Sequence, residues 1–173
     1  MIVIENYDII ERDRLQIIKL HSKYNPSRSS CNDSYSLGIH ELSHEDFLII
    51  KPFVEKVSMI VDMYVEYCCI SLFKTGDYME EHVDSKRTTT KYSSVSYLND
   101  DFEGGETVIT DNLIVNPQVG KTIYFDGCNL PHGVNQIKKG LRYTLSMWYT
   151  DSNNNLDHEY YRHLAYENLC RDS

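Results

Sequence analysis

The sequence predicts a mainly β protein of jelly-roll or barrel type, with helices ahead of the strands and a short helix after them. Seven short strand-like segments follow one another from residue 65 onward. Gly, Asn, Asp and Pro, which favour turns, separate these segments. Short strands at this spacing are typical of jelly rolls and barrels. Ahead of them, apolar residues recur at helical spacing, which predicts supporting helices.

The first 64 residues are expected to form the helical support region. After strand-like residues at 1–7, a helix is predicted at about 11–24, because apolar residues recur there on one side. Residues 25–36 are rich in Ser, Asn and Pro, and are predicted to be a loop.

A second helix is predicted to begin after Ser43, which forms a capping-box pattern with Asp46. Apolar residues at helical spacing continue this pattern as far as Val61 and Tyr64. Pro52 is expected either to kink this helix or to begin its main part.

The β core is expected to span residues 65–150 within one domain of residues 1–173. The predicted strands are residues 65–73, 92–98, 107–109, 113–115, 122–125, 133–137 and 142–149. The tail at 151–173 is predicted to carry the last helix, at about 156–169.

Composition narrows the class of protein. The net charge of −9 disfavours a nucleic-acid partner, because phosphate contacts need clustered Lys and Arg. The five cysteines show no C-x-x-C spacing and are expected to be reduced thiols. No signal peptide or membrane span is apparent, so we expect a cytoplasmic protein without a membrane partner. The predicted fold begins almost at Met1, which suggests a minimal domain without a visible targeting or peptide-binding module.

The most informative motif is His82-Val83-Asp84, followed later by His132 at the start of another predicted strand. An H-x-D tripeptide alone is weak evidence, and such a pair can lie on a surface loop. Here it follows a strand and a glycine turn, and residues two apart in a strand share a face. Two histidines and one carboxylate, with no thiolate, suit an iron(II) oxygenase site. Structural zinc sites more often contain cysteine.

Arg142 is the second informative residue. Strand alternation places Arg142, Thr144, Ser146 and Trp148 on one face of the last predicted strand. An arginine that points into a barrel is costly unless it meets an anion, and 2-oxoglutarate carries a suitable carboxylate. The alternative is that Arg142 faces solvent at a strand end.

Together these residues resemble the prolyl 4-hydroxylase-like branch of the 2-oxoglutarate and iron(II) oxygenases. The matching pieces are Gly76-Asp77-Tyr78, His82-Val83-Asp84, Ser96-Tyr97-Leu98-Asn99-Asp100, Glu103-Gly104-Gly105-Glu106-Thr107, Pro117-Gln118-Val119-Gly120-Lys121, Phe125, Pro131-His132-Gly133-Val134, Gly140-Leu141-Arg142-Tyr143 and Trp148. They cover about the C-terminal half of the chain in consistent order. The resemblance implies a double-stranded β-helix with helices packed on its outer sheet.

The resemblance also implies the roles of residues. His82, Asp84 and His132 would hold Fe(2+), and Arg142 would bind the 2-oxoglutarate carboxylate. The other residues implied in co-substrate binding are Tyr97, Thr144 and Trp148. Those assigned to the substrate region are Tyr78, Lys86, Arg87 and Glu106. Phe73 is a departure, since many relatives have a tyrosine there that bonds the co-substrate.

The implied activity is hydroxylation of an unactivated C–H bond with Fe(2+), 2-oxoglutarate, O2 and ascorbate as reductant. A prolyl residue in a peptide or protein is the favoured substrate. The alternative substrate is a free amino acid or a small metabolite. The alternative to an enzyme is a barrel that binds metal without turnover. Residues 85–91 could be a substrate lid or a solvated loop. A nucleic-acid demethylase is disfavoured because Trp148 occupies the position of its second arginine.

Overall fold

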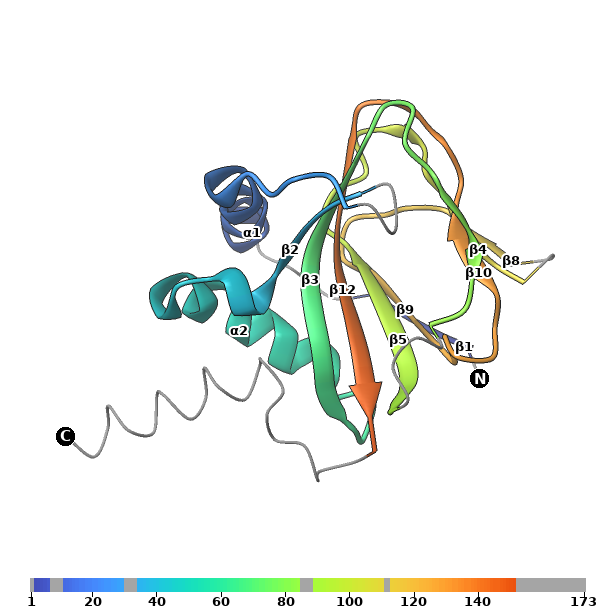
Figure 1. Cartoon of the computed structure of the whole chain (residues 1–173), viewed down its shortest axis with the longest axis horizontal. Coiled ribbons are helices and arrows are strands. Elements are labelled where there is room, and N and C mark those ends of the chain that lie inside the picture. The colour runs from blue at the N-terminus through green and yellow to red at the C-terminus, as the bar shows by residue number, and fades with distance from the viewer. Residues whose placement is uncertain (1, 7–10, 30–33, 85–88, 111–112, 152–173) are drawn as a thin grey trace.

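The computed structural model describes residues 2–6, 11–29, 34–84, 89–110 and 113–151. Two antiparallel sheets face each other, and two helices cover the outer face of the larger one (Figure 1). The six-stranded sheet has the order β1-β9-β5-β12-β3-β2, and the four-stranded sheet has the order β4-β10-β7-β8. A two-stranded ribbon pairs β11 with β6. The mainly β fold with helices ahead of its core is therefore confirmed.

The described residues form two α-helices, one 3-10 turn and twelve strands. The helices are α1 (Glu11–Tyr24), the 3-10 turn η1 (Ile39–Glu41) and α2 (His44–Ser58). The strands are β1 (Ile2–Asn6), β2 (Tyr35–Gly38), β3 (Tyr64–Lys74), β4 (Met79–His82), β5 (Thr90–Tyr97), β6 (Glu103–Gly104), β7 (Thr107–Ile109), β8 (Leu113–Val115), β9 (Lys121–Phe125), β10 (His132–Val134), β11 (Ile137–Lys139) and β12 (Leu141–Thr150). None of the described helices has the length and apolar character needed to cross a membrane.

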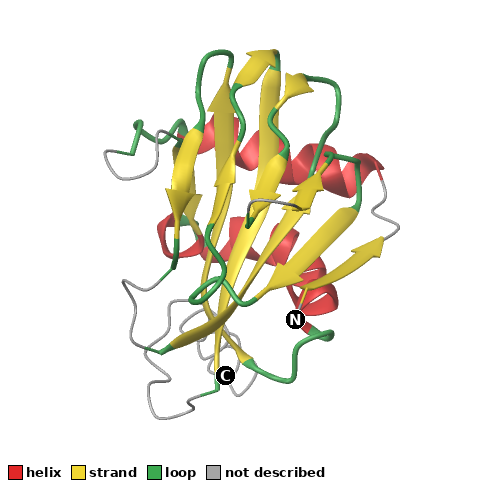
Figure 2. Cartoon of the chain, turned by 90° about the vertical axis from the view of Figure 1, so that its right-hand side faces the viewer, coloured by secondary structure: helices red, strands yellow, loops and turns green. Residues whose placement is uncertain are grey.

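The alternation predicted for the last strand, β12, is present. Tyr143, Leu145, Met147 and Tyr149 are buried in the core that β12 shares with α1, α2 and β3. Figure 2 shows both helices behind the strands. The other face of β12 points between the two sheets, where Arg142, Thr144, Ser146 and Trp148 line a cavity. One face of β12 therefore packs against the helices, and the opposite face lines the cavity.

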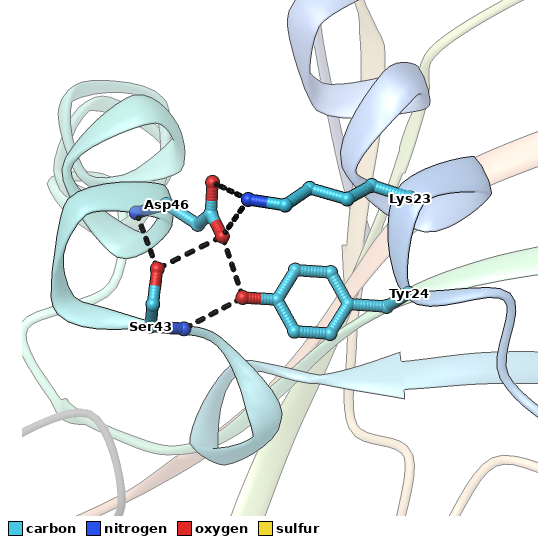
Figure 3. Close-up of polar contacts among 4 residues, drawn as sticks. All are labelled: Lys23, Tyr24, Ser43 and Asp46. Atoms are coloured by element: carbon cyan, nitrogen blue, oxygen red, sulfur yellow. Dashed lines mark hydrogen bonds and ion pairs between the residues drawn. The ribbon is translucent and has the colours of Figure 1, made fainter.

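The two helices are joined by a polar cluster around Asp46 (Figure 3). The Asp46 carboxylate accepts hydrogen bonds from Lys23 at 2.7 and 2.9 Å and from the Tyr24 hydroxyl at 2.5 Å. Ser43 caps α2, because its Oγ accepts from the Asp46 N–H at 3.2 Å, and its hydroxyl donates to the carboxylate at 2.9 Å. The predicted cap at Ser43 is thus confirmed, but the reciprocal bond of a capping box is not formed, because the Ser43 N–H donates to the Tyr24 hydroxyl at 2.8 Å.

The end of α2 differs from the prediction. The helix ends at Ser58, so Val61 lies beyond it and Tyr64 begins β3. Apolar spacing alone did not separate the last helical turn from the start of the next strand. Pro52 lies inside the helix rather than at its start, on the exposed face, where water can satisfy the carbonyl group four residues earlier.

The strand predictions also need three corrections. Residues 35 and 36, predicted to be loop, belong to β2. The segment 133–137, predicted as one strand, is divided between β10 and β11. Strands β4 and β6 were not predicted. The helix predicted at 156–169 lies outside the described residues.

Candidate metal centre

His82, Asp84 and His132 converge at one end of the space between the sheets. His82 ends β4 and His132 begins β10, and the two are register partners, which brings their ring centroids within 4.4 Å. Asp84 Oδ1 lies 3.7 Å from Nε2 of His82, and Asp84 Oδ2 lies 3.5 Å from Nε2 of His132. One potential ligand atom of each residue lies within 4.8 Å of the others. The structure therefore brings together all three predicted metal ligands.

Both imidazoles are held in the orientation that a metal ligand needs. Nδ1 of His82 lies 2.9 Å from the carbonyl oxygen of Glu80, and Nδ1 of His132 lies 2.9 Å from that of Leu130. A carbonyl oxygen can only accept, so each neutral ring donates its Nδ1–H there. The lone pair of each Nε2 then points toward the shared site, as in histidine metal sites oriented by a second hydrogen bond.

His132 is the more enclosed of the two histidines. Its side chain is 10% exposed, against 38% for His82. Its ring packs against that of Phe125 in a T-shaped arrangement, with 4.6 Å between the ring centroids. Burial lowers the pKa of His132, and the nearby Asp84 carboxylate only partly opposes this. The neutral form, which binds metals, is therefore favoured.

Asp84 is held by two residues that sequence analysis did not identify. The Ser93 hydroxyl donates to Oδ2 at 2.5 Å. The Asp84 N–H donates to the carbonyl oxygen of Gly127 at 2.8 Å. Ser93 is a small polar residue on the cavity face of β5, which is the one local signal that could have pointed to it.

The donor set fits iron(II). Two neutral imidazoles and one carboxylate form the set typical of non-haem iron oxygenases, and no thiolate competes for the ion. In the described part of the chain, no other group of at least three His, Cys, Asp or Glu side chains converges in this way.

The triad opens into a cavity of about 550 Å³ between the two sheets. Strands β3, β5 and β12 supply one wall, and β4 and β10 supply the other. Among the predicted site residues, Thr144, Trp148 and Tyr78 line this cavity. Thr144 is buried, whereas Tyr78 is 42% exposed at the mouth.

Arg142 lines the same cavity and is 1% exposed. Nε donates to the carbonyl oxygen of Gly105 at 3.0 Å, and Nη2 donates to Oγ1 of Thr107 at 3.1 Å. The rings of Phe73 and Tyr97 each lie 5.3 Å from the guanidinium carbon. Burial lowers the pKa of Arg142, but an arginine remains charged in proteins.

The charge of Arg142 is not neutralised within the described residues, where no carboxylate lies within ion-pair distance of it. Two neutral acceptors and two aromatic faces orient the guanidinium without cancelling its charge. A buried cation of this kind is costly unless an anion joins it. The cavity therefore offers an anion site and a cation site.

The remaining predicted residues do not line this cavity in the described part of the chain. Tyr97 is fully buried beside Arg142, and its hydroxyl is 2.6 Å from Oγ1 of Thr107. Glu106 is not brought to this cavity: it lines a separate groove and accepts a hydrogen bond from Asn135 at 3.0 Å. Lys86 and Arg87 lie outside the described residues.

Comparison with solved structures identifies the fold. A Pseudomonas putida prolyl-4-hydroxylase superposes with a TM-score of 0.69 at 15% identity, covering 87% of this chain and 92% of that one. The viral collagen prolyl hydroxylase of Paramecium Bursaria Chlorella virus-1 gives 0.68 at 18% identity, with 88% and 96% covered. This chain therefore has the double-stranded β-helix fold of 2-oxoglutarate and iron(II) oxygenases of prolyl hydroxylase type.

Sequence comparison gives partial homology to prolyl 3-hydroxylases. Human prolyl 3-hydroxylase 2 is 39% identical over 70 residues, which is 36% of this chain and 10% of that protein. Prolyl 3-hydroxylase 1 of Gallus gallus is also 39% identical over 70 residues, with the same shares. The matched region thus spans about a tenth of these relatives. No family model matches the chain.

Proposed function

We propose that this chain is an iron(II)- and 2-oxoglutarate-dependent oxygenase that hydroxylates a prolyl residue in a peptide or protein. The observation that carries the oxygenase assignment is the buried guanidinium of Arg142 in the same cavity as the His82, Asp84 and His132 triad. A metal site beside an uncompensated buried cation is suited to a co-substrate with two acidic ends.

The residues present fit both groups. His82, Asp84 and His132 would hold Fe(2+), and Arg142 would bind the far carboxylate of 2-oxoglutarate. The two cofactors together would activate O2 for C–H oxidation while 2-oxoglutarate is converted to succinate and carbon dioxide, with ascorbate keeping the iron reduced.

The protein contributes position and exclusion of water. Three protein ligands leave the other coordination positions free for co-substrate and O2. Hydrogen bonds to Gly105 and Thr107 orient the guanidinium of Arg142 before 2-oxoglutarate binds, so its carboxylate would meet a preorganised cation. The two sheets enclose these groups, which strengthens each electrostatic contact.

A prolyl substrate is supported by the aromatic surface at the cavity and by the relatives. The ring of Trp148 lies 5.4 Å from that of Tyr67, and both line the cavity. Such faces pack well against the apolar body of a saturated ring. One solved structure with this fold is a prolyl hydroxylase in complex with a hypoxia inducible factor peptide fragment. The homologous curated proteins are prolyl 3-hydroxylases, so oxidation at C3 and at C4 must both be assayed.

The test is a coupled assay on a library of proline-containing peptides. Purified protein with Fe(2+), 2-oxoglutarate and ascorbate should form succinate and add the mass of one oxygen atom to a peptide. Amino-acid analysis of the product should distinguish 3-hydroxyproline from 4-hydroxyproline. His82→Ala should abolish both signals, while His44→Ala, in α2 outside the triad, should retain them.

Two outcomes would contradict this proposal. Turnover of a free amino acid or small metabolite, with no turnover of any peptide, would remove the peptide substrate. Metal binding with no succinate above the His82→Ala background on any substrate would remove the oxygenase activity.

A further inference from the structure

Asp84 is enclosed on one side by two residues that are not in the triad. Besides the hydrogen bonds already described, the backbone of Gly127 lies directly against the carboxylate. A Cβ atom at Gly127 would lie 2.4 Å from Asp84 Oδ2 and 2.3 Å from Ser93 Oγ. Real Cβ contacts essentially never reach such distances. A side chain at position 127, in the loop after β9, would therefore force Asp84 or Ser93 to move.

Ser93 is itself held firmly. It is 3% exposed in β5, where it is the register partner of Trp148 on β12 and of Phe125 on β9. A residue paired on both sides within a six-stranded sheet has little freedom to move. The Ser93 hydroxyl is therefore presented to Asp84 from a fixed point.

The same cross-strand pair supports two of the three candidate ligands. Ser93 donates to the carboxylate of Asp84, and its partner Phe125 packs against the ring of His132. The larger sheet thus carries the residues that orient two ligands supplied by β10 and by the segment after β4.

We infer that Ser93 and Gly127 are positioning residues that fix the Asp84 carboxylate for the metal before the metal binds. The inference rests on the proposed function for the identity of the metal. Ser93 and Gly127 close one side of the carboxylate, so an ion reaches it from the side of His82 and His132. Because the carboxylate is already oriented, binding does not have to immobilise it.

The first test compares metal affinity in matched serine variants. Ser93→Ala removes the hydroxyl that bonds Asp84. Ser96→Ala removes an equally buried hydroxyl from the same strand, whose partner is Thr122 at 2.8 Å. Affinity for Co(2+), followed by absorption titration, should fall about 10- to 100-fold in Ser93→Ala, the range seen when a group that orients a ligand is removed. It should stay within about threefold of wild type in Ser96→Ala.

Two more variants separate positioning from general damage. Ser93→Thr keeps the hydroxyl and should recover most of the affinity lost in Ser93→Ala. Gly127→Ala should weaken Co(2+) binding at least as much as Ser93→Ala, because its Cβ displaces the carboxylate. Melting temperatures without metal should change similarly in Ser93→Ala and Ser96→Ala, so that lost stability alone does not explain the difference.

The second test does not depend on a metal. In a metal-free crystal structure of Ser93→Ala, the Asp84 carboxylate should leave the orientation seen here. An unchanged carboxylate, or wild-type Co(2+) affinity in Ser93→Ala, would overturn the inference. If the wild-type protein bound Co(2+) but formed no succinate, the oxygenase proposal would fail while the positioning roles remained intact.

Discussion

Gly105 lies directly against the side chain of Arg142. Its carbonyl oxygen accepts the hydrogen bond from Nε, and a Cβ atom added to it would lie 3.0 Å from Cδ of the arginine and 2.5 Å from Cδ1 of Ile137. Its φ of +69° is also a conformation that favours glycine. Gly105 thus accepts a hydrogen bond from the guanidinium of Arg142, and its lack of a side chain leaves space for the aliphatic part of the arginine.

Replacing Gly105 by alanine should therefore weaken co-substrate binding. The added methyl group crowds Arg142 as well as Ile137 and Phe102. If the guanidinium shifts, we expect the KM for 2-oxoglutarate to rise about 10-fold or more, since a bond to a charged group is worth roughly 1.5–3 kcal/mol. Steady-state kinetics would measure this. Gly76→Ala is the matched control, because Gly76 also has a positive φ, of +94°, but nothing within 4 Å of its Cβ position. An equal rise in KM in both variants would refute the contact with Arg142.

Arg142→Met should separate co-substrate binding from stability. Because no described carboxylate pairs with Arg142, removing its charge relieves a burial cost. This gain offsets the loss of two hydrogen bonds to neutral acceptors and of the contacts with the rings of Phe73 and Tyr97. Without ligands, we expect a melting temperature close to that of the wild type.

The difference should appear when co-substrate is added. With metal present, 2-oxoglutarate at about 100 times its Kd should stabilise the wild type by about 2.7 kcal/mol, and Arg142→Met should show no such gain. Differential scanning fluorimetry with and without 2-oxoglutarate measures both effects. A variant that melts far below the wild type without ligand would show that the hydrogen bonds of Arg142 are mainly structural.

His21 should make stability depend on pH. Its Nε2 lies 2.7 Å from the carbonyl oxygen of Tyr35, and burial lowers its pKa below the ordinary 6.5. As the pH falls through 6.5, His21 therefore binds a proton in the unfolded chain, whereas in the folded protein it does so only at lower pH. The contribution of neutral His21 is complete above that pH and is lost as pH falls toward the folded pKa.

The comparison variant is His21→Gln, which keeps an N–H donor for Tyr35 but does not titrate. Urea unfolding between about pH 7 and about pH 5 should show a steeper loss of unfolding free energy in the wild type, by at most about 1.4 kcal/mol per pH unit. Parallel slopes in the two proteins would show that His21 is not responsible.

Local periodicity was enough to predict the features that one segment carries by itself. The alternation along β12 separated Arg142 and Trp148 from the core residues between them, because side chains alternate strictly in a strand. Strand β4 was missed because it is an edge strand, and Glu80 and Glu81 give it no alternating apolar pattern.

The residues that hold the candidate ligands could not be predicted in this way. Ser93 reaches Asp84 through the register of β5, and Gly127 reaches it through the path of a loop. Thr107 meets Arg142 only because the two sheets face each other. These contacts depend on tertiary packing, which no spacing within a single segment records.

The Asp46 cluster offers a test of what joins the two helices. Lys23, and then Tyr24, lower the pKa of Asp46 below its ordinary 3.8. The carboxylate therefore contributes its full stability above that pH and loses it as the pH falls further. Asp46→Ala removes the acceptor for Tyr24 and Ser43 as well as the partner of Lys23 (Figure 3). We expect a loss of about 1–3 kcal/mol of unfolding free energy at neutral pH.

Lys23→Met should cost far less, although Lys23 is the largest cause of the lowered pKa. Its side chain is 62% exposed, and exposed ion pairs add little because water and salt screen them. Tyr24→Phe should fall between the two, since it removes the hydroxyl that links Asp46 to the Ser43 N–H, at 2.8 Å. Urea unfolding of the three variants measures this order. If Lys23→Met were as damaging as Asp46→Ala, the ion pair rather than the hydrogen bonds would join α1 to α2.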